Sequence, residues 1–184
     1  MDRILGFRKE YRYSFKGILF RLCLFLAMMT IMRLTAFHVG QLSGGQGILD
    51  LCVLPTPSFT ATALSRFSGK ALLFYRWVFF AVDLVYVLSY CTFYRYAIQY
   101  LMQKGPVSAN IAEKLAFMPI IGGISDLLEN SVLFLMLGMK SYPVWICVLF
   151  LLFNTVKYLF VYTSLGAVIC GILYRIKYRK NTLT

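Results

Sequence analysis

Four long apolar blocks occupy most of this 184-residue chain. They run over about residues 17–37, 71–93, 115–139 and 143–173. About 20 apolar residues in a helix cross the hydrocarbon core of a bilayer, which is about 30 Å thick. Hydrophobic residues make up 60% of the chain and charged residues 14%, against about half and about a quarter in a soluble domain. The sequence therefore predicts an all-α protein, a four-helix transmembrane bundle that forms one membrane domain.

The connections between these blocks differ in length. The first block follows a basic stretch, as in a signal peptide, but it is long and lacks a small-x-small cleavage site, so we expect an uncleaved helix. Residues 39–69 form a long loop, in which Ser58 to Phe67 could form a short interfacial helix capped by Ser58. Only residues 140–142 separate the last two blocks, which predicts an antiparallel hairpin with Pro143 in the first turn of the fourth helix.

Basic residues predict the orientation and the partners of the helices. The net charge is +12, and its main clusters lie in the arms 1–16 and 174–184, directly against apolar blocks. Thirteen basic residues fall on one predicted side: Arg3, Arg8, Lys9, Arg12, Lys16, Arg21, Arg95, Lys104, Lys114, Arg175, Lys177, Arg179 and Lys180. The other side has Arg66, Lys70 and Lys140. The positive-inside rule then puts both termini in the cytoplasm, with anionic lipid headgroups rather than nucleic acid as the partner.

Cysteine and histidine carry little functional signal. Four of the five cysteines lie in apolar blocks with no CxxC spacing, which indicates small apolar side chains rather than a disulfide framework. The single histidine, His38, lies at the end of the first block and is interpreted as an interfacial residue. The sequence identifies no metal site and no cofactor.

Ionisable and amide side chains lie within the last three apolar blocks. They are Asp83 in the second, Asp126, Glu129 and Asn130 in the third, and Asn154 and Lys157 in the fourth. A rise of about 1.5 Å per residue places the charged groups of all three blocks roughly 20 Å from one end of the bundle. The i, i+3 and i+4 spacing of the set in the third block puts its members on one helix face. We therefore expect the six side chains to meet inside the bundle.

The cost of intramembrane charge makes a shared site necessary. One central charge costs about 3 kcal/mol even on an insertion scale, so four unpaired charges would cost on the order of 10 kcal/mol. One lysine cannot neutralise three carboxylates, so a proton or a cation must complete the balance. Pro119, Gly122 and Gly123 share the face of Asp126, and their small bulk would admit a close neighbour, a kink or a cavity.

Three functions fit this pattern. The first is binding of a polar or amphipathic, lipid-like ligand, with binding residues Asp83, Asp126, Glu129, Asn130, Asn154, Lys157 and Tyr86. The second is an intramembrane lipid-modifying enzyme, with Asp126 and Glu129 as acid/base candidates and Lys157 as the group that stabilises negative charge. The third is a scaffold in which the cluster only fixes helix packing. A homo-oligomer or a larger membrane complex is compatible with each. A proton- or cation-coupled carrier is a further alternative, and because four helices are few for a carrier, we expect it to oligomerise.

The segment Asp126-Leu-Leu-Glu129-Asn130, with an aspartate in the preceding helix and a lysine in the following one, resembles a family of four-helix membrane proteins of roughly this length. The resemblance covers about residues 58–175. It implies the four-helix architecture and the choice of site residues, and it implies no reaction. The first helix and the glycine-rich loop lie outside it.

Overall fold

The computed structural model describes residues 13–49, 52, 55–102, 108–139 and 141–181, and all regular structure among them is helical. Four helices are long: α1 (Phe15–Leu42), α4 (Phe80–Met102), α5 (Ala109–Met136) and α6 (Val144–Asn181). Three elements are short: α2 (Pro57–Leu64), α3 (Gly69–Leu73) and the π-helix η2 (Phe74–Phe79). Residues 1–12, which hold Arg3, Arg8, Lys9 and Arg12, lie outside the described residues.

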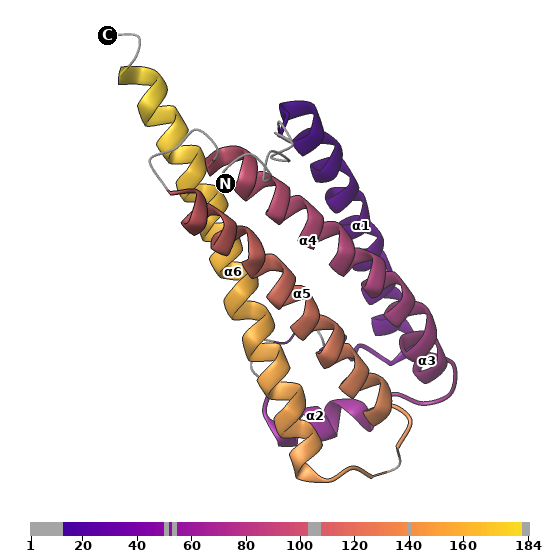
Figure 1. The fold of residues 1–184 in the computed structure, drawn as a ribbon. Helices are drawn as coiled ribbons and strands as arrows, with labels where there is room; N and C mark the ends of the chain where they lie inside the picture. The colour runs from indigo at the N-terminus through magenta and orange to yellow at the C-terminus, as the bar shows by residue number, and fades with distance from the viewer. Residues whose placement is uncertain (1–12, 50–51, 53–54, 103–107, 140, 182–184) are drawn as a thin grey trace, which may run out of the picture.

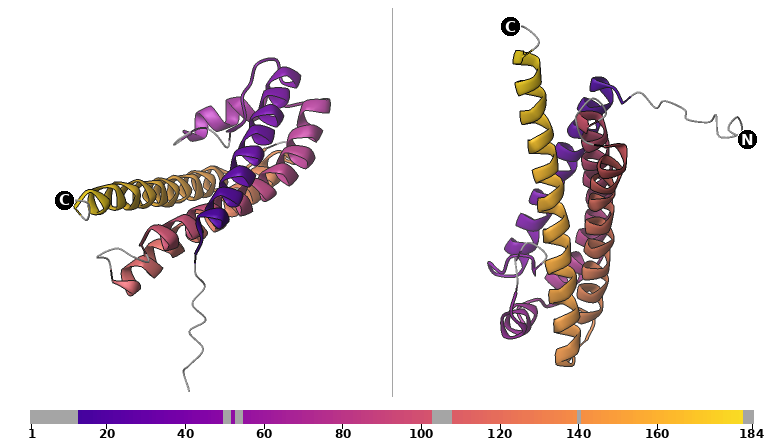
Figure 2. Two further views of the ribbon diagram at one scale, coloured as in Figure 1. Left: turned by 90° about the horizontal axis from the view of Figure 1, so that it is seen from above. Right: turned by 60° about the vertical axis from the view of Figure 1, so that its left-hand side comes forward.

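The long helices run alongside one another (Figures 1 and 2). Helix α5 packs between α4 and α6, α4 also contacts α6, and α1 packs on α4 and η2. Helices α1 and α6 have no extended contact with each other. Helix α1 begins and α6 ends at the same end of the molecule, the terminal end, whereas α2 and the α5–α6 connection lie at the opposite end, the loop end.

The helices extend beyond several of the predicted bounds. The second apolar block was expected to end near residue 93, but α3, η2 and α4 form one continuous helical stretch to Met102. The added turns are held by packing, because Ala97, Ile98 and Leu101 are buried in a cluster that also contains residues of α5 and α6. The helix therefore ends where its packing surface ends, not where its hydropathy falls. Pro143 directly precedes the first residue of α6 instead of lying in its first turn.

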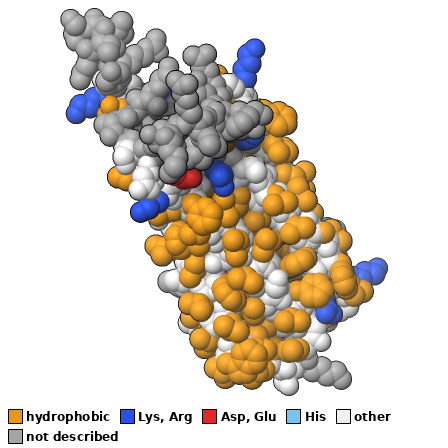
Figure 3. Space-filling view, in the orientation of Figure 1, with side chains coloured by type: hydrophobic (Ala, Val, Ile, Leu, Met, Phe, Trp, Pro, Cys, Tyr) orange, Lys and Arg blue, Asp and Glu red, His pale blue; other side chains and the backbone are white. Residues whose placement is uncertain are grey.

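Three helices are long and apolar enough to cross a membrane by length and composition: Phe15–Leu42, Gly69–Met102 and Val144–Lys177. Helix α5 has the length, 28 residues, but it carries Asp126, Glu129 and Asn130 and is not one of the three. Hydrophobic side chains cover most of the face seen in Figure 3, with lysine and arginine mainly near its margins. Such an apolar band is typical of an integral membrane protein.

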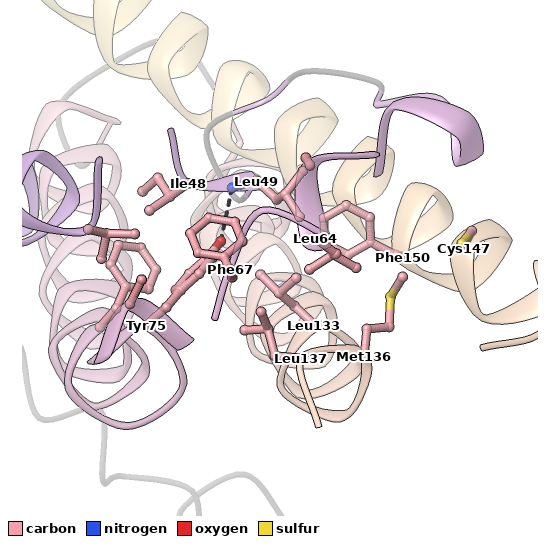
Figure 4. Close-up of a cluster of buried hydrophobic side chains, with 14 of the residues drawn as sticks. Ile48, Leu49, Leu64, Phe67, Tyr75, Leu133, Met136, Leu137, Cys147 and Phe150 are labelled. Carbon is pink, nitrogen blue, oxygen red and sulfur yellow. Dashed lines mark hydrogen bonds between the residues drawn. The ribbon is translucent and has the colours of Figure 1, made fainter. Parts of the chain in front are cut away.

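The loop end is sealed by a hydrophobic cluster that includes part of the long loop (Figure 4). Ile48 and Leu49 are 4% and 0% exposed, and the Leu49 N–H donates to the Tyr75 hydroxyl at 2.9 Å. These residues were expected in an external loop, but they lie in the core among side chains of α2, α5 and α6. A loop this deep is tolerated because its polar backbone groups find partners in the protein.

Helix α2 occupies the position of the predicted interfacial helix, with a different N-cap. The Thr56 hydroxyl accepts the Phe59 N–H at 3.2 Å, and Pro57 fills the first turn. The prediction of Ser58 as the cap was wrong because Pro57, which has no N–H to donate, fits the first helical position, and the N-cap therefore lies two residues nearer the amino terminus, at Thr56.

Candidate functional site

The six predicted polar side chains meet between α4, α5 and α6. Each is at most 7% exposed: Asp83 1%, Asp126 2%, Glu129 0%, Asn130 2%, Asn154 0% and Lys157 7%. They lie between two hydrophobic clusters, one toward the loop end and one toward the terminal end. We call these six residues, together with Tyr90, the polar cluster.

Lys157 is the cationic centre of the polar cluster. Its Nζ lies 3.0 Å from Asp126 Oδ1 and 2.8 Å from Glu129 Oε2, so one ammonium group bridges two carboxylates one turn apart on α5. The i, i+3 spacing makes this bridge feasible, because both carboxylates project from the α5 face that meets α6. These two residues and Lys157 are also the sequence-based catalytic candidates, and the structure brings all three into direct contact.

Asn130 connects α4 to this ion pair. Its Nδ2 donates to Asp83 Oδ2 and, at 3.3 Å, to Asp126 Oδ1. The hydroxyl of Tyr90 donates to the second oxygen of Asp126 at 2.9 Å. Tyr90, which is not among the seven predicted binding residues, thus makes a direct contact to the central carboxylate. Its spacing of seven residues from Asp83, two helical turns, was the available signal.

Asn154 links the polar cluster to the long loop. Its Nδ2 donates to Glu129 Oε1 at 2.9 Å and to the backbone carbonyl of Cys52 at 3.0 Å. The role of Cys52 could not be read from its side chain, because the contact uses a main-chain oxygen. The loop thus supplies a polar group to a site about 15 Å from the start of α6, at 1.5 Å per residue.

The small residues of α5 serve close packing. A Cβ on Gly123 would overlap Cys91 Sγ of α4 and lie 3.2 Å from Val87 Cγ1. A Cβ on Gly122 would lie 3.3 Å from Phe160 Cβ of α6. Of the three alternatives predicted for this face, the close neighbour is the one found at these glycines. The close approach brings α4 and α6 near enough to α5 for their polar side chains to meet.

A cavity of about 110 Å³ adjoins the polar cluster on its terminal side. Asp126 and Lys157 form its polar wall, and the other lining residues are Phe25, Tyr86, Tyr90, Tyr94, Tyr158 and Val161. Tyr86, the seventh predicted binding residue, therefore lies in the cavity wall. The cavity lies where α1 and α6 face each other without packing together.

A larger cavity of about 470 Å³ lies at the loop end, between α2 and the α5–α6 connection. Its lining is apolar with Ser65, Ser141 and Tyr142 as polar members, and it has no ionisable group of the polar cluster. Burial raises the pKa of Tyr142 above its ordinary value, which keeps the phenol neutral. This cavity is the larger of the two, but the ionisable residues Asp126 and Lys157 line the smaller one, which we therefore take as the candidate site.

The remaining residues considered from the sequence lie elsewhere. The ring of His38 packs edge-on against Phe74 at 4.7 Å between centroids, and none of the five cysteines, all of which lie among the described residues, is in a disulfide bond. Within the described part of the chain, no group of three His, Cys, Asp or Glu side chains is arranged to hold a metal ion.

The described residues define an all-helical protein with three helices long and apolar enough to span a membrane and with a buried, charged cluster. Comparisons with protein-family models, curated proteins and solved structures gave no match. The resemblance to a four-helix membrane family therefore stays a prediction.

Proposed function

We propose that the chain is a multi-pass membrane protein with four transmembrane helices and both termini in the cytoplasm, and that its polar cluster binds the polar group of an amphipathic, lipid-like ligand. The cavity that carries both Asp126 and Lys157 in its wall is the observation that supports ligand binding most directly.

The four-helix topology rests on α5 as the remaining span. Helix α5 is 28 residues long and packs between α4 and α6, both of which are apolar enough to cross a membrane. Asp126 and Glu129 of this helix face the protein interior, so they need not meet lipid. Four crossings return the chain to its starting side, in agreement with the common end of α1 and α6 (Figure 1). The basic arms then assign that side to the cytoplasm.

The cavity favours a binding site over a cluster that only fixes helix packing. If the cluster only fixed helix packing, we would expect other side chains to pack tightly against it, because atoms that line a void lose dispersion contacts. Here about 110 Å³ remains open beside the central ion pair. That volume is well below the roughly 300 Å³ at which pockets for drug-sized ligands begin. It suits the polar end of a ligand whose apolar remainder lies between α1 and α6.

Copurified lipid tests this proposal. The protein is purified in a mild detergent as wild type, as Asp126→Asn and as Thr155→Val, and the bound lipids are identified by mass spectrometry. Asp126→Asn keeps an acceptor for the Tyr90 hydroxyl and leaves Glu129 to pair with Lys157, so we expect the fold to survive. Thr155 is exposed on α6 and bonds only to the Leu151 carbonyl, which makes it a matched control.

We expect one lipid class to be enriched with wild type and with Thr155→Val, and to fall at least fivefold with Asp126→Asn. Equal lipid profiles for all three proteins would refute ligand binding at the cluster.

The topology is tested separately by impermeant thiol labelling of a cysteine introduced at Asn181. Labelling from outside intact cells would contradict a cytoplasmic carboxyl terminus.

A further inference from the structure

The wall of the candidate site is mostly aromatic. Five of its eight lining residues carry rings: Phe25 from α1, Tyr86, Tyr90 and Tyr94 from α4, and Tyr158 from α6. Three of the four helices that line the cavity, all except α5, thus supply at least one ring. An apolar ligand would be served equally well by aliphatic side chains, so the choice of rings calls for a chemical reason.

The rings contact one another around the cavity. The ring centroid of Phe25 lies 6.0 Å from those of both Tyr86 and Tyr94, and Tyr86 and Tyr90 are 5.5 Å apart. Phe25 therefore joins α1 to the tyrosines of α4, while Tyr158 lines the cavity from α6. The faces of such rings carry negative electrostatic potential and attract cations within about 6 Å of their centroids.

The charge of the polar cluster has the same sign as these ring faces. Asp83, Asp126 and Glu129 bring three carboxylates and Lys157 one ammonium group, so full ionisation leaves two negative charges in excess. Arg76 is directed elsewhere, because its guanidinium lies 4.3 Å from the Phe134 ring centroid, near the loop end of α5. A cation in the cavity would reduce the excess charge at a place with little water to screen it.

An anionic ligand is disfavoured by the same geometry. Lys157 lines the cavity, but its Nζ is already within 3.0 Å of one carboxylate and 2.8 Å of another. A phosphate or carboxylate that approached this lysine would also approach Asp126 and Glu129. Close like charges in a buried site cost several kcal/mol, so Lys157 cannot serve as an anion receptor without displacing its partners.

We propose that the candidate site takes an ammonium group, either a protonated amine or a quaternary ammonium, attached to a single long apolar chain. This inference rests on the ligand-binding function proposed above and names its chemical class. The rings of Phe25, Tyr86, Tyr90 and Tyr94 surround the cationic group, and the excess negative charge of the polar cluster, which reaches the cavity at Asp126, supplies the opposite charge. The Tyr158 ring is shared with Lys157, whose Nζ lies 5.4 Å from the ring centroid. The apolar chain leaves between α1 and α6, which do not pack together and would face the lipid hydrocarbon.

The closing experiment compares head groups on one chain length. Dodecyltrimethylammonium, laurate and dodecanol are added, each at a concentration well below micelle formation, to the purified protein in a neutral maltoside detergent. Binding is measured by native mass spectrometry. Tetramethylammonium is tested as a competitor, because it carries the same cation without a chain. The proteins are wild type, Tyr86→Leu, Tyr86→Trp and, as a control for loss of an aromatic ring, Phe117→Leu, which removes an exposed ring of α5 that does not line the cavity.

We expect dodecyltrimethylammonium to bind wild type most tightly. Loss of one ring should weaken its Kd about 5- to 30-fold in Tyr86→Leu, the range for one cation–π contact at a desolvated site. Tyr86→Trp should restore most of the affinity, because tryptophan is the strongest partner for a cation, and Phe117→Leu should bind as wild type. Rescue by another aromatic residue separates a cation–π contact from a loss of packing.

The contrary results are distinct. If laurate or dodecanol binds as tightly as the cation and depends equally on Tyr86, the ammonium inference is wrong while ligand binding stands. If the Tyr86 substitutions change the affinity of none of the probes, and Asp126→Asn retains the wild-type lipid profile, both proposals fail. If tetramethylammonium displaces the long-chain cation at equal concentration, the cation site is supported and the requirement for an apolar chain is refuted.

Discussion

Removal of the charge of Lys157 is the most informative perturbation of the polar cluster. Lys157→Met replaces the lysine with an uncharged side chain of similar length. It leaves Asp126 and Glu129, which lie 3.0 and 2.8 Å from Nζ, without their counter-charge. Loss of one partner of a buried ion pair destabilises a protein by about 3 to 5 kcal/mol, because the remaining charge is uncompensated. Glu129 is 0% exposed, so the upper part of that range applies.

The pairwise interaction can be isolated with a double-mutant cycle. Glu129→Gln keeps an oxygen that can accept the Asn154 amide, and it removes the negative charge that faces Lys157. We expect the double variant to be less destabilised than the sum of the single variants by about 1 to 3 kcal/mol, since the second change removes the charge that the first left unpaired. Thr155→Val provides the control on the exposed side of α6.

Unfolding of the purified protein in mixed micelles, followed by circular dichroism against the mole fraction of SDS, measures these free energies. Additive single effects, or a Lys157→Met variant as stable as Thr155→Val, would show that the lysine does not hold the two carboxylates together. Lys157 would then also not be the cation that offsets part of the negative charge of Asp126 and Glu129.

Three further perturbations test the packing around the site. Gly123→Ala should cost about 1 to 3 kcal/mol in the same unfolding assay, because its methyl group would overlap α4, whereas Gly166→Ala has nothing within 4 Å and should be neutral or slightly stabilising; equal effects would contradict the close α4–α5 approach. Asn154→Leu should speed alkylation of Cys52 at least tenfold in a background with the other cysteines replaced, because the loop loses its amide donor; an unchanged rate would show that this contact does not hold the loop. Tyr75→Phe should cost about 1 kcal/mol by removing the hydroxyl that accepts a loop N–H, and a stability equal to wild type would refute that bond's contribution.

The sequence allowed the polar cluster to be predicted because side-chain chemistry and helical periodicity were sufficient for it. Asp126 and Glu129 had to find Lys157, since leaving any of them in lipid costs several kcal/mol. The rise per residue then placed them at one depth. The contact between Asn154 and Cys52 could not be predicted in this way, because it uses a backbone carbonyl of a loop whose path depends on tertiary packing.

The ends of the helices, like the path of the loop, depend on tertiary packing and were predicted less well than the helix centres. Hydropathy predicted the centre of the second span but not its extension to Met102, because that extension is stabilised by contacts of Ala97 and Leu101 with other helices. Tertiary packing overrides local hydropathy at such positions. The location of the cavity was likewise beyond the sequence. The glycines of α5 were compatible with a close neighbour, a kink or a cavity, and neighbouring helices fill the space at Gly122 and Gly123.

The π-helix η2 determines which way the second span faces the site. Ala71, Tyr75, Phe79 and Asp83 recur every four residues, and all four are at most 2% exposed. In a regular α-helix, at about 100° per residue, the twelve steps from Ala71 to Asp83 would rotate the last side chain a third of a turn away from the first. The wider turn at residues 74–79 absorbs that rotation. Because of this wider turn, one row of side chains on the second apolar helix contacts both the hydrophobic cluster at the loop end, through Ala71, Tyr75 and Phe79, and the polar cluster, through Asp83.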